Sequence, residues 1–389
     1  MGECCETGGG DVRELLLMKY LKICVINHPA SFNRIPIDNL LRALVSIAPN
    51  IHCIFGAYEY NHYRHDTTLI CHHIPNTAHS NTILRILNYL HLQIRLVQKI
   101  YKLKNEIDTY LFFIGGDTLL LPIVFSKILN KNIILLLAGS SIKTHQVNQD
   151  KLTFGLKILR EPCLSLADNI VVYTSSLIQD YQIERYRHKS LIAHRHFLDF
   201  EAFTVTTPLP DRSPLIGYIG RLSDEKGVQH FVQALPAILG GREDLHVLIG
   251  GDGQLKESIE ASLKEEGIVA RVDLPGWISH NDLPRYLNRL LLLILPSYTE
   301  GLPNIMLEAM ACGTPVLATP VGAIPDVILD GKTGFIMKNN SPECIAENVL
   351  RALEHPDLER IAEAGRRFVE ENFTFERVVE RWKEVLDEI

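Results

Sequence analysis

The sequence lacks the features that mark several common classes of protein. The longest apolar stretch, 111–137, is interrupted by Gly115, Gly116, Asp117 and Lys127, so neither piece is long enough to cross a bilayer. The 8 cysteines are scattered without any pair at the spacing of a zinc finger. Lys and Arg are nowhere concentrated as in a nucleic-acid-binding protein. We therefore expect a reduced, intracellular protein of the cytoplasm that does not bind nucleic acid and holds no structural metal.

Charge is divided unevenly along the chain. The formal net charge is -7, but residues 1–200 carry a small excess of Lys and Arg, and residues 201–389 carry a large excess of Asp and Glu. Of the 16 histidines, most lie in the first half. A mildly basic half beside an acidic one permits an anionic substrate or a membrane surface at the first half.

Length and apolar periodicity predict two domains. A chain of 389 residues exceeds the usual size of a single domain. Short apolar runs alternate with helical patterns throughout, which predicts parallel sheets covered by helices. The α/β fold that we expect therefore has two Rossmann-like domains that face each other across a cleft. We expect these segments: an extension at 1–17, a first, acceptor-side domain at 18–203, a linker at 204–213, a second, donor domain at 214–372, and a final helix at 373–389.

Two carboxylates bracket the start of a predicted helix. The apolar run 290–295 predicts a buried strand, Glu300 follows it in a turn, Pro303 suits the first helical position, and Gly313 closes the helix that contains Glu308. A helix N-terminus can hold a diphosphate, and carboxylates accept hydrogen bonds from hydroxyls. A nucleotide sugar combines both groups. The alternative is that both carboxylates are ordinary surface charges near a helix start.

The sequence around these carboxylates resembles a known signature. The run from Glu300 to Val316 is similar to the donor site of retaining GT-B glycosyltransferases of the family 4 type (glycosyl transferases group 1). Further blocks of the same family occur in its order at 217–227, 250–253, 276–278, 321–326 and 330–335. The resemblance is strong over 215–389 and loose before it. It implies the GT-B fold, with the C-terminal helix crossing back onto the first domain.

The resemblance also implies roles for individual residues. Arg221 and Lys226 would neutralise the departing diphosphate, Glu308 would bind the ribose hydroxyls, and Glu300 would contact the transferred sugar. The remaining donor-side positions that the family implies are Leu302, Pro303, Asn304, Gly251, Asp252 and Ile278. The family retains the anomeric configuration without needing an enzymic nucleophile; Glu300 acting as a covalent nucleophile is the alternative.

No metal or other cofactor is expected. The sequence contains no Asp-x-Asp, the motif of the metal-dependent sugar transferases of the other main fold. The cations Arg221 and Lys226 would supply the charge that a divalent metal supplies elsewhere. We therefore predict metal-independent transfer.

The first domain departs from the family pattern. Many members carry a histidine at the position of Ala138, so its role must pass to another group or be absent. The candidates on the acceptor side are Asp117, Ser140, Ser141 and His145. The acceptor is therefore an unknown hydroxyl compound. A nucleotide-sugar-binding protein without transfer activity, or a nucleotide-sugar epimerase of the same fold, remain alternatives.

One segment suggests what the acceptor is attached to. Residues 81–104 predict an amphipathic helix with basic but no acidic side chains. Its expected apolar face comprises Ile83, Leu84, Leu87, Leu90, Ile94, Val97 and Tyr101. Such a helix either covers the sheet with a solvated basic side or contacts anionic lipid headgroups. A lipid-linked acceptor, or a growing glycan, at the cytoplasmic face of a membrane is the hypothesis that follows from the second reading.

Overall fold

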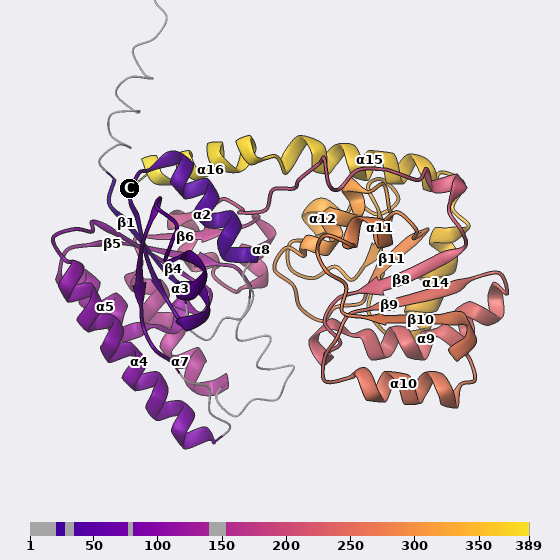
Figure 1. The fold of residues 1–389 in the computed structure, drawn as a ribbon, viewed down its shortest axis with the longest axis horizontal. Helices are drawn as coiled ribbons and strands as arrows, with labels where there is room; N and C mark the ends of the chain where they lie inside the picture. Colours follow the sequence, from indigo (N-terminus) through magenta and orange to yellow (C-terminus); the bar gives the residue numbers. More distant parts are fainter. Residues whose placement is uncertain (1–20, 28–34, 77–80, 140–152, 389) are drawn as a thin grey trace, which may run out of the picture.

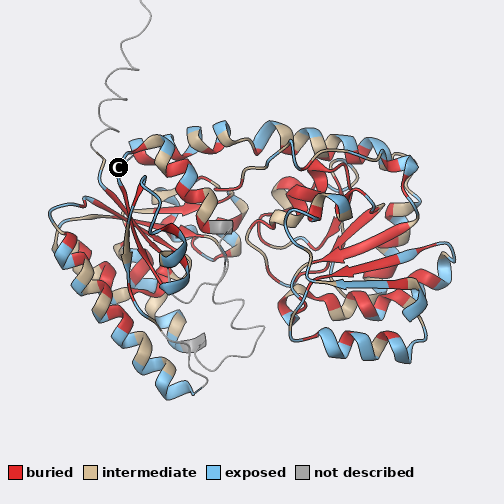
Figure 2. Ribbon diagram, in the orientation of Figure 1, coloured by how far each residue is buried: buried red, intermediate tan, exposed pale blue. Residues whose placement is uncertain are grey.

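The structure, a computed structural model, describes residues 21–27, 35–76, 81–139 and 153–388. Two α/β domains lie side by side, and the chain passes between them near residue 203 and again near residue 373 (Figure 1). In both domains the strands are buried and the helices expose their outer sides (Figure 2). The predicted fold of two Rossmann-like parallel-sheet domains is confirmed.

The first domain is built on a parallel sheet of 7 strands in the order β3-β2-β1-β4-β5-β6-β7. The strands are β1 Ile23–Asn27, β2 Ile51–Phe55, β3 Leu69–His73, β4 Thr109–Phe113, β5 Asn132–Leu137, β6 Asn169–Val172 and β7 Ser190–Ile192. The helices are α2 Ile35–Ile47, α3 Ala57–Tyr63, α4 Thr82–Leu103, α5 Leu120–Ile128, α7 Thr153–Leu166 and α8 Ser176–Asp180. The central strands β1 and β4 are buried along their whole length, as expected for a sheet covered on both faces.

The second domain has a parallel sheet of 6 strands in the order β10-β9-β8-β11-β12-β13. The strands are β8 Leu215–Ile219, β9 His246–Gly250, β10 Val272–Gly276, β11 Leu292–Leu295, β12 Val316–Ala318 and β13 Phe335–Ile336. The helices are α9 Val228–Gly241, α10 Lys256–Glu265, α11 Leu283–Leu287, α12 Asn304–Ala311, α13 Ile324–Val327, α14 Pro342–Leu353, α15 Leu358–Asn372 and α16 Phe375–Asp387. The strand order reverses direction between β8 and β11, which is where open parallel sheets bind ligands.

The C-terminal helix returns to the first domain. Helix α15 belongs to the second domain, whereas α16 packs against α2 of the first (Figure 1). Thr374 begins α16, and its side chain accepts a hydrogen bond from the backbone N–H of Arg377 at 3.3 Å. The Trp382 side chain is fully buried, and its indole N–H donates to the backbone carbonyl of His194 at 3.1 Å. The expected crossover is therefore present.

The segment between the sheets is fastened to the second domain rather than free. Arg212 is buried, and its guanidinium donates to the carbonyls of Leu290 at 2.8 Å and Cys312 at 2.7 Å and to the Thr314 hydroxyl at 2.7 Å. Burial lowers the pKa of Arg212 to about 10. Because Cys312 ends α12, the cation also lies at the negative end of that helix.

Helix α4 covers the sheet with a side other than its expected apolar face. The residues that cover the sheet side are Leu92, Leu96, Ile100 and Leu103. Of the apolar face expected from the sequence, Ile83, Leu84, Leu87, Leu90, Ile94 and Tyr101 are exposed. The helix thus has two apolar sides, and the side expected either to cover the sheet or to contact lipid headgroups is not the one that covers the sheet. Among the described residues, no helix is long and apolar enough to cross a membrane.

Candidate functional site

The loops after several strands of the second sheet meet at one edge. The backbone N–H of Gly220, after β8, donates to Gly250 at 3.0 Å, and that of Gly251, after β9, donates to Gly276 at 2.7 Å. Gly251 has a φ of 134°, and a Cβ there would lie 1.8 Å from the carbonyl oxygen of Gly220. Only glycine allows these loops to approach so closely. The carboxyl ends of β8, β9 and β10 therefore form one continuous rim.

Lys226 and Glu300 form an ion pair on this rim. The Lys226 ammonium lies 2.7 Å from Oε1 of Glu300, which also accepts a hydrogen bond from the Ser297 hydroxyl at 2.7 Å. The Glu300 side chain is only 9% exposed, and that of Lys226 is 27% exposed. The pair joins the loop after β8 to the loop after β11. A cation and a hydroxyl-binding carboxylate are thereby placed side by side at the switch point of the sheet.

Arg221 is held more loosely. Its side chain is 65% exposed, and a guanidinium nitrogen lies 3.3 Å from Oε1 of Glu225. The Glu225 side chain is 8% exposed and accepts a hydrogen bond from the Ser223 hydroxyl at 2.7 Å. The Tyr218 hydroxyl donates to the backbone carbonyl of Arg221 at 2.6 Å, which fixes the turn. Arg221 thus has an anchored backbone and a side chain that can reach an anion.

Glu308 has a partner that the sequence analysis did not identify. It lies in the middle of α12 with its side chain 7% exposed, and Oε1 is 3.0 Å from Nε2 of His280. The hydrogen bond to Glu308 raises the pKa of His280 above its usual value, against the opposing effect of burial. The His280 ring also contacts that of Phe203, where the chain leaves the first domain. Glu308 is therefore a nearly buried carboxylate whose described partner is half-exposed.

The start of α12 faces the same edge. The first helical residue is Asn304, one position later than the predicted start at Pro303, and no side chain caps the helix. The backbone N–H of Met306 donates to the Pro303 carbonyl at 3.2 Å, and the N–H groups before it are left for another acceptor. Leu302 and Pro303 are buried, so the approach to α12 is rigidly packed. The loop can present backbone donors to an anion.

The other predicted donor-side residues lie on the neighbouring loops. Ile278 packs on Gly250, since a Cβ at Gly250 would lie 2.5 Å from the end of the Ile278 side chain. Asp252 is exposed, and its backbone carbonyl accepts from the N–H of Leu222 at 2.9 Å. Trp277 is 77% exposed and so is not a core residue. The structure thus brings all the donor-side candidates to one edge of the second sheet.

The segment that follows β5 in the first domain contacts this edge of the second domain. A Cβ at Gly301 would lie 2.3 Å from the carbonyl oxygen of Ala138, so Ala138 lies directly beside the loop that carries Glu300. Asp117 is buried and pairs with Arg160 at 3.3 Å. Ser140, Ser141 and His145 lie outside the described residues. The position at which the resembling family carries a histidine therefore faces the candidate site across the domain boundary.

A second contact crosses the same boundary. The Ser176 hydroxyl, at the start of α8, hydrogen-bonds to the Asp326 carboxylate and lies 3.4 Å from the carbonyl oxygen of Gly322. Gly322 lies in the loop after β12. The contact therefore holds the first domain against a second loop of the second domain, in addition to the loop that carries Glu300. The two domains touch on both sides of the candidate site.

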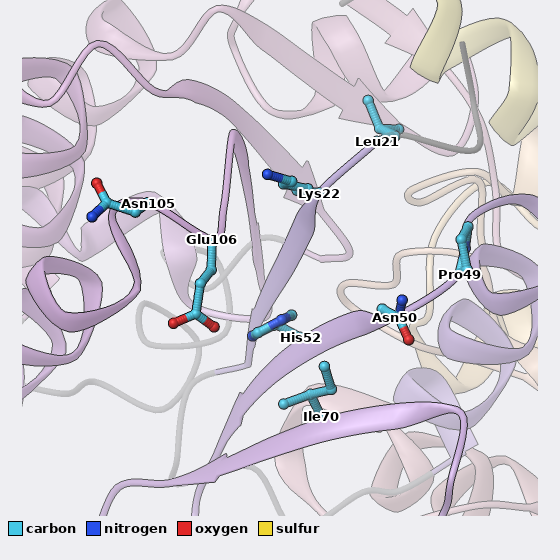
Figure 3. Close-up of a pocket in the computed structure, with 8 residues that line it drawn as sticks. All are labelled: Leu21, Lys22, Pro49, Asn50, His52, Ile70, Asn105 and Glu106. Carbon is cyan, nitrogen blue, oxygen red and sulfur yellow. The ribbon is translucent and has the colours of Figure 1, made fainter. Parts of the chain in front are cut away.

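A cavity of about 350 Å³ lies away from this edge (Figure 3). Lys22, Asn50, His52 and Glu106 line it together with Leu21, Pro49, Ile70 and Asn105. Most of these residues stand at or before the first residues of β1, β2, β3 and β4. The cavity is therefore at the amino ends of the strands, whereas ligands of open parallel sheets bind at the carboxyl ends.

Sequence reasoning missed the residues that support the candidate side chains. Ser297 and Glu225 lie three and four residues from Glu300 and Arg221, so their closeness in sequence was an available signal. His280 is 28 residues from Glu308, and nothing local indicates the pairing. Only the placement of the loop after β10 beside α12 brings these two together.

Solved structures share the whole architecture. A crystal structure of HepE from Anabaena in complex with UDP and glucose has a TM-score of 0.72 at 16% identity, covering 95% of this chain and 100% of that one. Sucrose-phosphate synthase from Thermosynechococcus elongatus has a TM-score of 0.74 at 19% identity, covering 94% and 98%. With its two facing parallel sheets, the chain has the GT-B fold of glycosyltransferases.

Sequence similarity to known glycosyltransferases lies in the second domain. Residues 199–368 match the family described as glycosyl transferases group 1. Alpha-D-kanosaminyltransferase from Streptomyces kanamyceticus is 30% identical over 186 residues, which is 46% of this chain and 48% of that protein. A GDP-mannose-dependent monoacylated alpha-(1-6)-phosphatidylinositol monomannoside mannosyltransferase from Corynebacterium glutamicum is 27% identical over 49% and 54%. The chain spans about half the length of the curated relatives it matches.

Proposed function

We propose that the chain is a glycosyltransferase that moves a sugar from a nucleoside diphosphate to a hydroxyl acceptor, with retention of anomeric configuration and without a metal ion. The observation that carries the proposal is the Lys226–Glu300 pair beside the uncapped start of α12. A cation and free helix N–H groups suit a diphosphate, and a carboxylate suits sugar hydroxyls. The group 1 domain and the relatives named as glycosyltransferases support the same activity.

Each side chain has a distinct task in this proposal. Lys226 and Arg221 neutralise the charge that develops on the departing diphosphate, which lowers the barrier to breaking the sugar–phosphate bond. Glu308 accepts hydrogen bonds from the ribose hydroxyls. When the nucleotide binds, Oε1 of Glu308 therefore either keeps its hydrogen bond to His280 beside the new one or exchanges it for the ribose hydroxyl. Glu300, held by Lys226 and Ser297, accepts from hydroxyls of the transferred sugar.

Retention follows if the acceptor attacks on the face from which the diphosphate departs. The leaving diphosphate oxygen then takes the acceptor proton, and no enzymic nucleophile is needed. Metal independence is proposed because the sequence has no Asp-x-Asp and the rim supplies two cations, Arg221 and Lys226. HepE in complex with UDP and glucose makes UDP the first nucleotide to test.

A binding protein without transfer is the second candidate. Ala138 carries no side-chain polar group, yet it lies beside Gly301 where the resembling family places a histidine. A chain that had lost transfer would bind the nucleotide sugar and release no diphosphate in the presence of any acceptor. An epimerase of the same fold would convert the donor without an acceptor.

The experiment that tests the proposal is calorimetric binding of UDP, GDP and ADP, each with and without magnesium. We expect one nucleotide to bind equally well in both conditions and about tenfold more weakly to Glu308→Ala, because a charged hydrogen bond to the ribose is lost. Glu257→Ala, on the exposed face of α10, is the matched control and leaves affinity unchanged. Absence of binding by all three nucleotides contradicts the proposal. Diphosphate release with a supplied acceptor then separates a transferase from a binding protein.

A further inference from the structure

Arg195 is a buried cation without a counter-ion. The residue is 5% exposed, and its Nε–H donates to the Tyr173 hydroxyl at 2.9 Å. Nη1 is buried and has no hydrogen-bond partner, and no carboxylate among the described residues pairs with the guanidinium. Burying a charge without a compensating partner costs free energy, so buried polar groups are normally paired. Arg195 therefore leaves part of a strong hydrogen-bond donor unused.

Other well-packed arginines of the chain show the contrast. Arg160 pairs with Asp117 at 3.3 Å. Arg212 donates to backbone carbonyls and to a hydroxyl, and Arg271 donates to backbone carbonyls at 3.1, 3.2, 2.7 and 2.8 Å. Each of these side chains fastens one part of the fold to another. The guanidinium of Arg195 has aromatic rings around it instead of acceptors, so its charge has no structural use of this kind.

Arg195 lies at the carboxyl end of the first sheet. Its guanidinium carbon is 6.0 Å from the ring centre of Phe113, the last residue of β4, and 5.5 Å from that of Tyr173, which follows β6. Strand β5 lies between β4 and β6, so the charge is next to the carboxyl end of β5. Ala138, which is half-buried, and Gly139, which is exposed, follow β5. Neither has a side chain large enough to shield Arg195 from the second domain.

The residue after Arg195 touches the second domain. His196 is 1% exposed. Burial and the charge of Arg195 lower the pKa of His196 well below its usual value, and the backbone of Leu302 acts in the opposite direction. The uncharged ring therefore lies beside the loop that leads into α12. Arg195 is thus on the first-domain side of this boundary, opposite the loop that carries Glu300.

A guanidinium suits an oxyanion better than a neutral group. Its planar fork donates two parallel hydrogen bonds to a carboxylate or phosphate, and the opposite charge offsets the cost of burial. The diphosphate of the proposed donor already has two cations on the second domain, Arg221 and Lys226. We propose that Arg195 binds a carboxylate or phosphate group of the acceptor at the carboxyl end of β5, so that the acceptor is an anionic hydroxyl compound. That the ligand is an acceptor rests on the proposed function, whereas the anion site itself is tested without turnover.

The experiment is an NMR titration of the full chain, with isotope-labelled arginine, by acetate and by methyl phosphate at constant ionic strength. The Nε–H signal of Arg195 is identified by its absence from Arg195→Met, or from Arg195→Lys if the first variant does not fold. We expect this signal to shift saturably with at least one of the two anions. The Arg271 signal should stay in place, because backbone carbonyls already occupy that guanidinium. The anion that binds more tightly identifies the acceptor group as carboxylate or phosphate.

Further variants separate this site from the donor side and from a structural role. The Arg195 signal should still shift when Arg221→Met and Lys226→Met remove the donor-side cations. Arg195→Met should leave the urea midpoint unchanged or raise it, because an unpaired buried charge is removed, whereas Arg271→Met should lower it by leaving carbonyls unpaired.

Three results would overturn the proposal. They are an Arg195 signal that neither anion moves, a shift that is lost in the donor-side variant, and a urea midpoint of Arg195→Met as low as that of Arg271→Met. Nucleotide binding is measured in a separate experiment. A failure of the proposed function is therefore distinguished from a failure of the anion site.

Discussion

The Lys226–Glu300 pair predicts opposite effects of two substitutions on diphosphate binding. In the free protein the Lys226 ammonium is neutralised by Glu300 at 2.7 Å, so a diphosphate meets a cation that is already paired. Two unit charges about 4 Å apart interact by about 4 kcal/mol at an effective dielectric constant of about 20. Because Lys226 is 27% exposed, solvent screening reduces the difference to about 1 kcal/mol. Glu300→Gln should therefore bind UDP about fivefold more tightly, and Lys226→Met should bind it more weakly.

The assay is calorimetry with the diphosphate alone, together with urea unfolding of each variant. Lys226→Met leaves the nearly buried Glu300 with Ser297 as its remaining described partner, which should lower the free energy of unfolding by about 1–3 kcal/mol. Glu257→Gln controls for the loss of a carboxylate elsewhere on the domain. The reasoning is refuted if Glu300→Gln weakens diphosphate binding as much as Lys226→Met does.

Further predictions concern the supports of the site. Arg212→Leu removes the donors to several buried carbonyls and should lower the free energy of unfolding by about 3 kcal/mol in urea; a change below about 1 kcal/mol would contradict this. The pKa of His280, followed by NMR, should fall toward its usual value in Glu308→Gln, because the hydrogen bond that raises it loses its charge. In the wild type, the pairing of His280 with Glu308 contributes fully to the free energy of unfolding below about pH 6.5. This contribution is lost as the pH rises through the raised pKa of His280. A contribution that does not change with pH would count against the pairing. In Gly301→Val the new side chain should collide with the Ala138 carbonyl and hold the domains apart. Small-angle scattering would record this as a larger radius of gyration. An unchanged radius would show that the contact is not maintained in solution.

The regular strands were predictable because burial leaves a clear signature. The runs that form β1, β2, β4 and β5 are nearly continuous apolar segments, as strands covered on both faces require. Strands β3 and β7 lack this signature for a physical reason. Both are edge strands, and both are partly exposed: β3 contains two histidines, and β7 has only 3 residues. A strand at the edge of a sheet is partly exposed and can therefore contain polar residues, so it lacks the continuous apolar run by which buried strands are recognised.

Helix α4 and His280 show the limits of local pattern. Periodicity found the helix within a residue of each end, but it could not tell an apolar side that packs from one that faces outward, because both satisfy the same spacing. The predicted donor-side residues do lie together at the carboxyl edge of the second sheet, because they all follow strands of that sheet. The His280–Glu308 contact depends on how the loop after β10 is placed beside α12, which no spacing along the chain encodes.

The returning helix α16 affects the order in which the protein can mature. Helix α16 packs against α2 of the first domain, and the Trp382 indole N–H donates a hydrogen bond to the carbonyl of His194, which lies in the segment after β7. A nascent chain therefore exposes this part of the first domain until residues 375–387 have left the ribosome, whereas the sheet of the second domain is complete by residue 336. Vectorial synthesis usually favours the earlier domain. Here the domain that is begun first is completed last, and a chain truncated before α16 would carry an unfinished N-terminal core beside a complete second sheet.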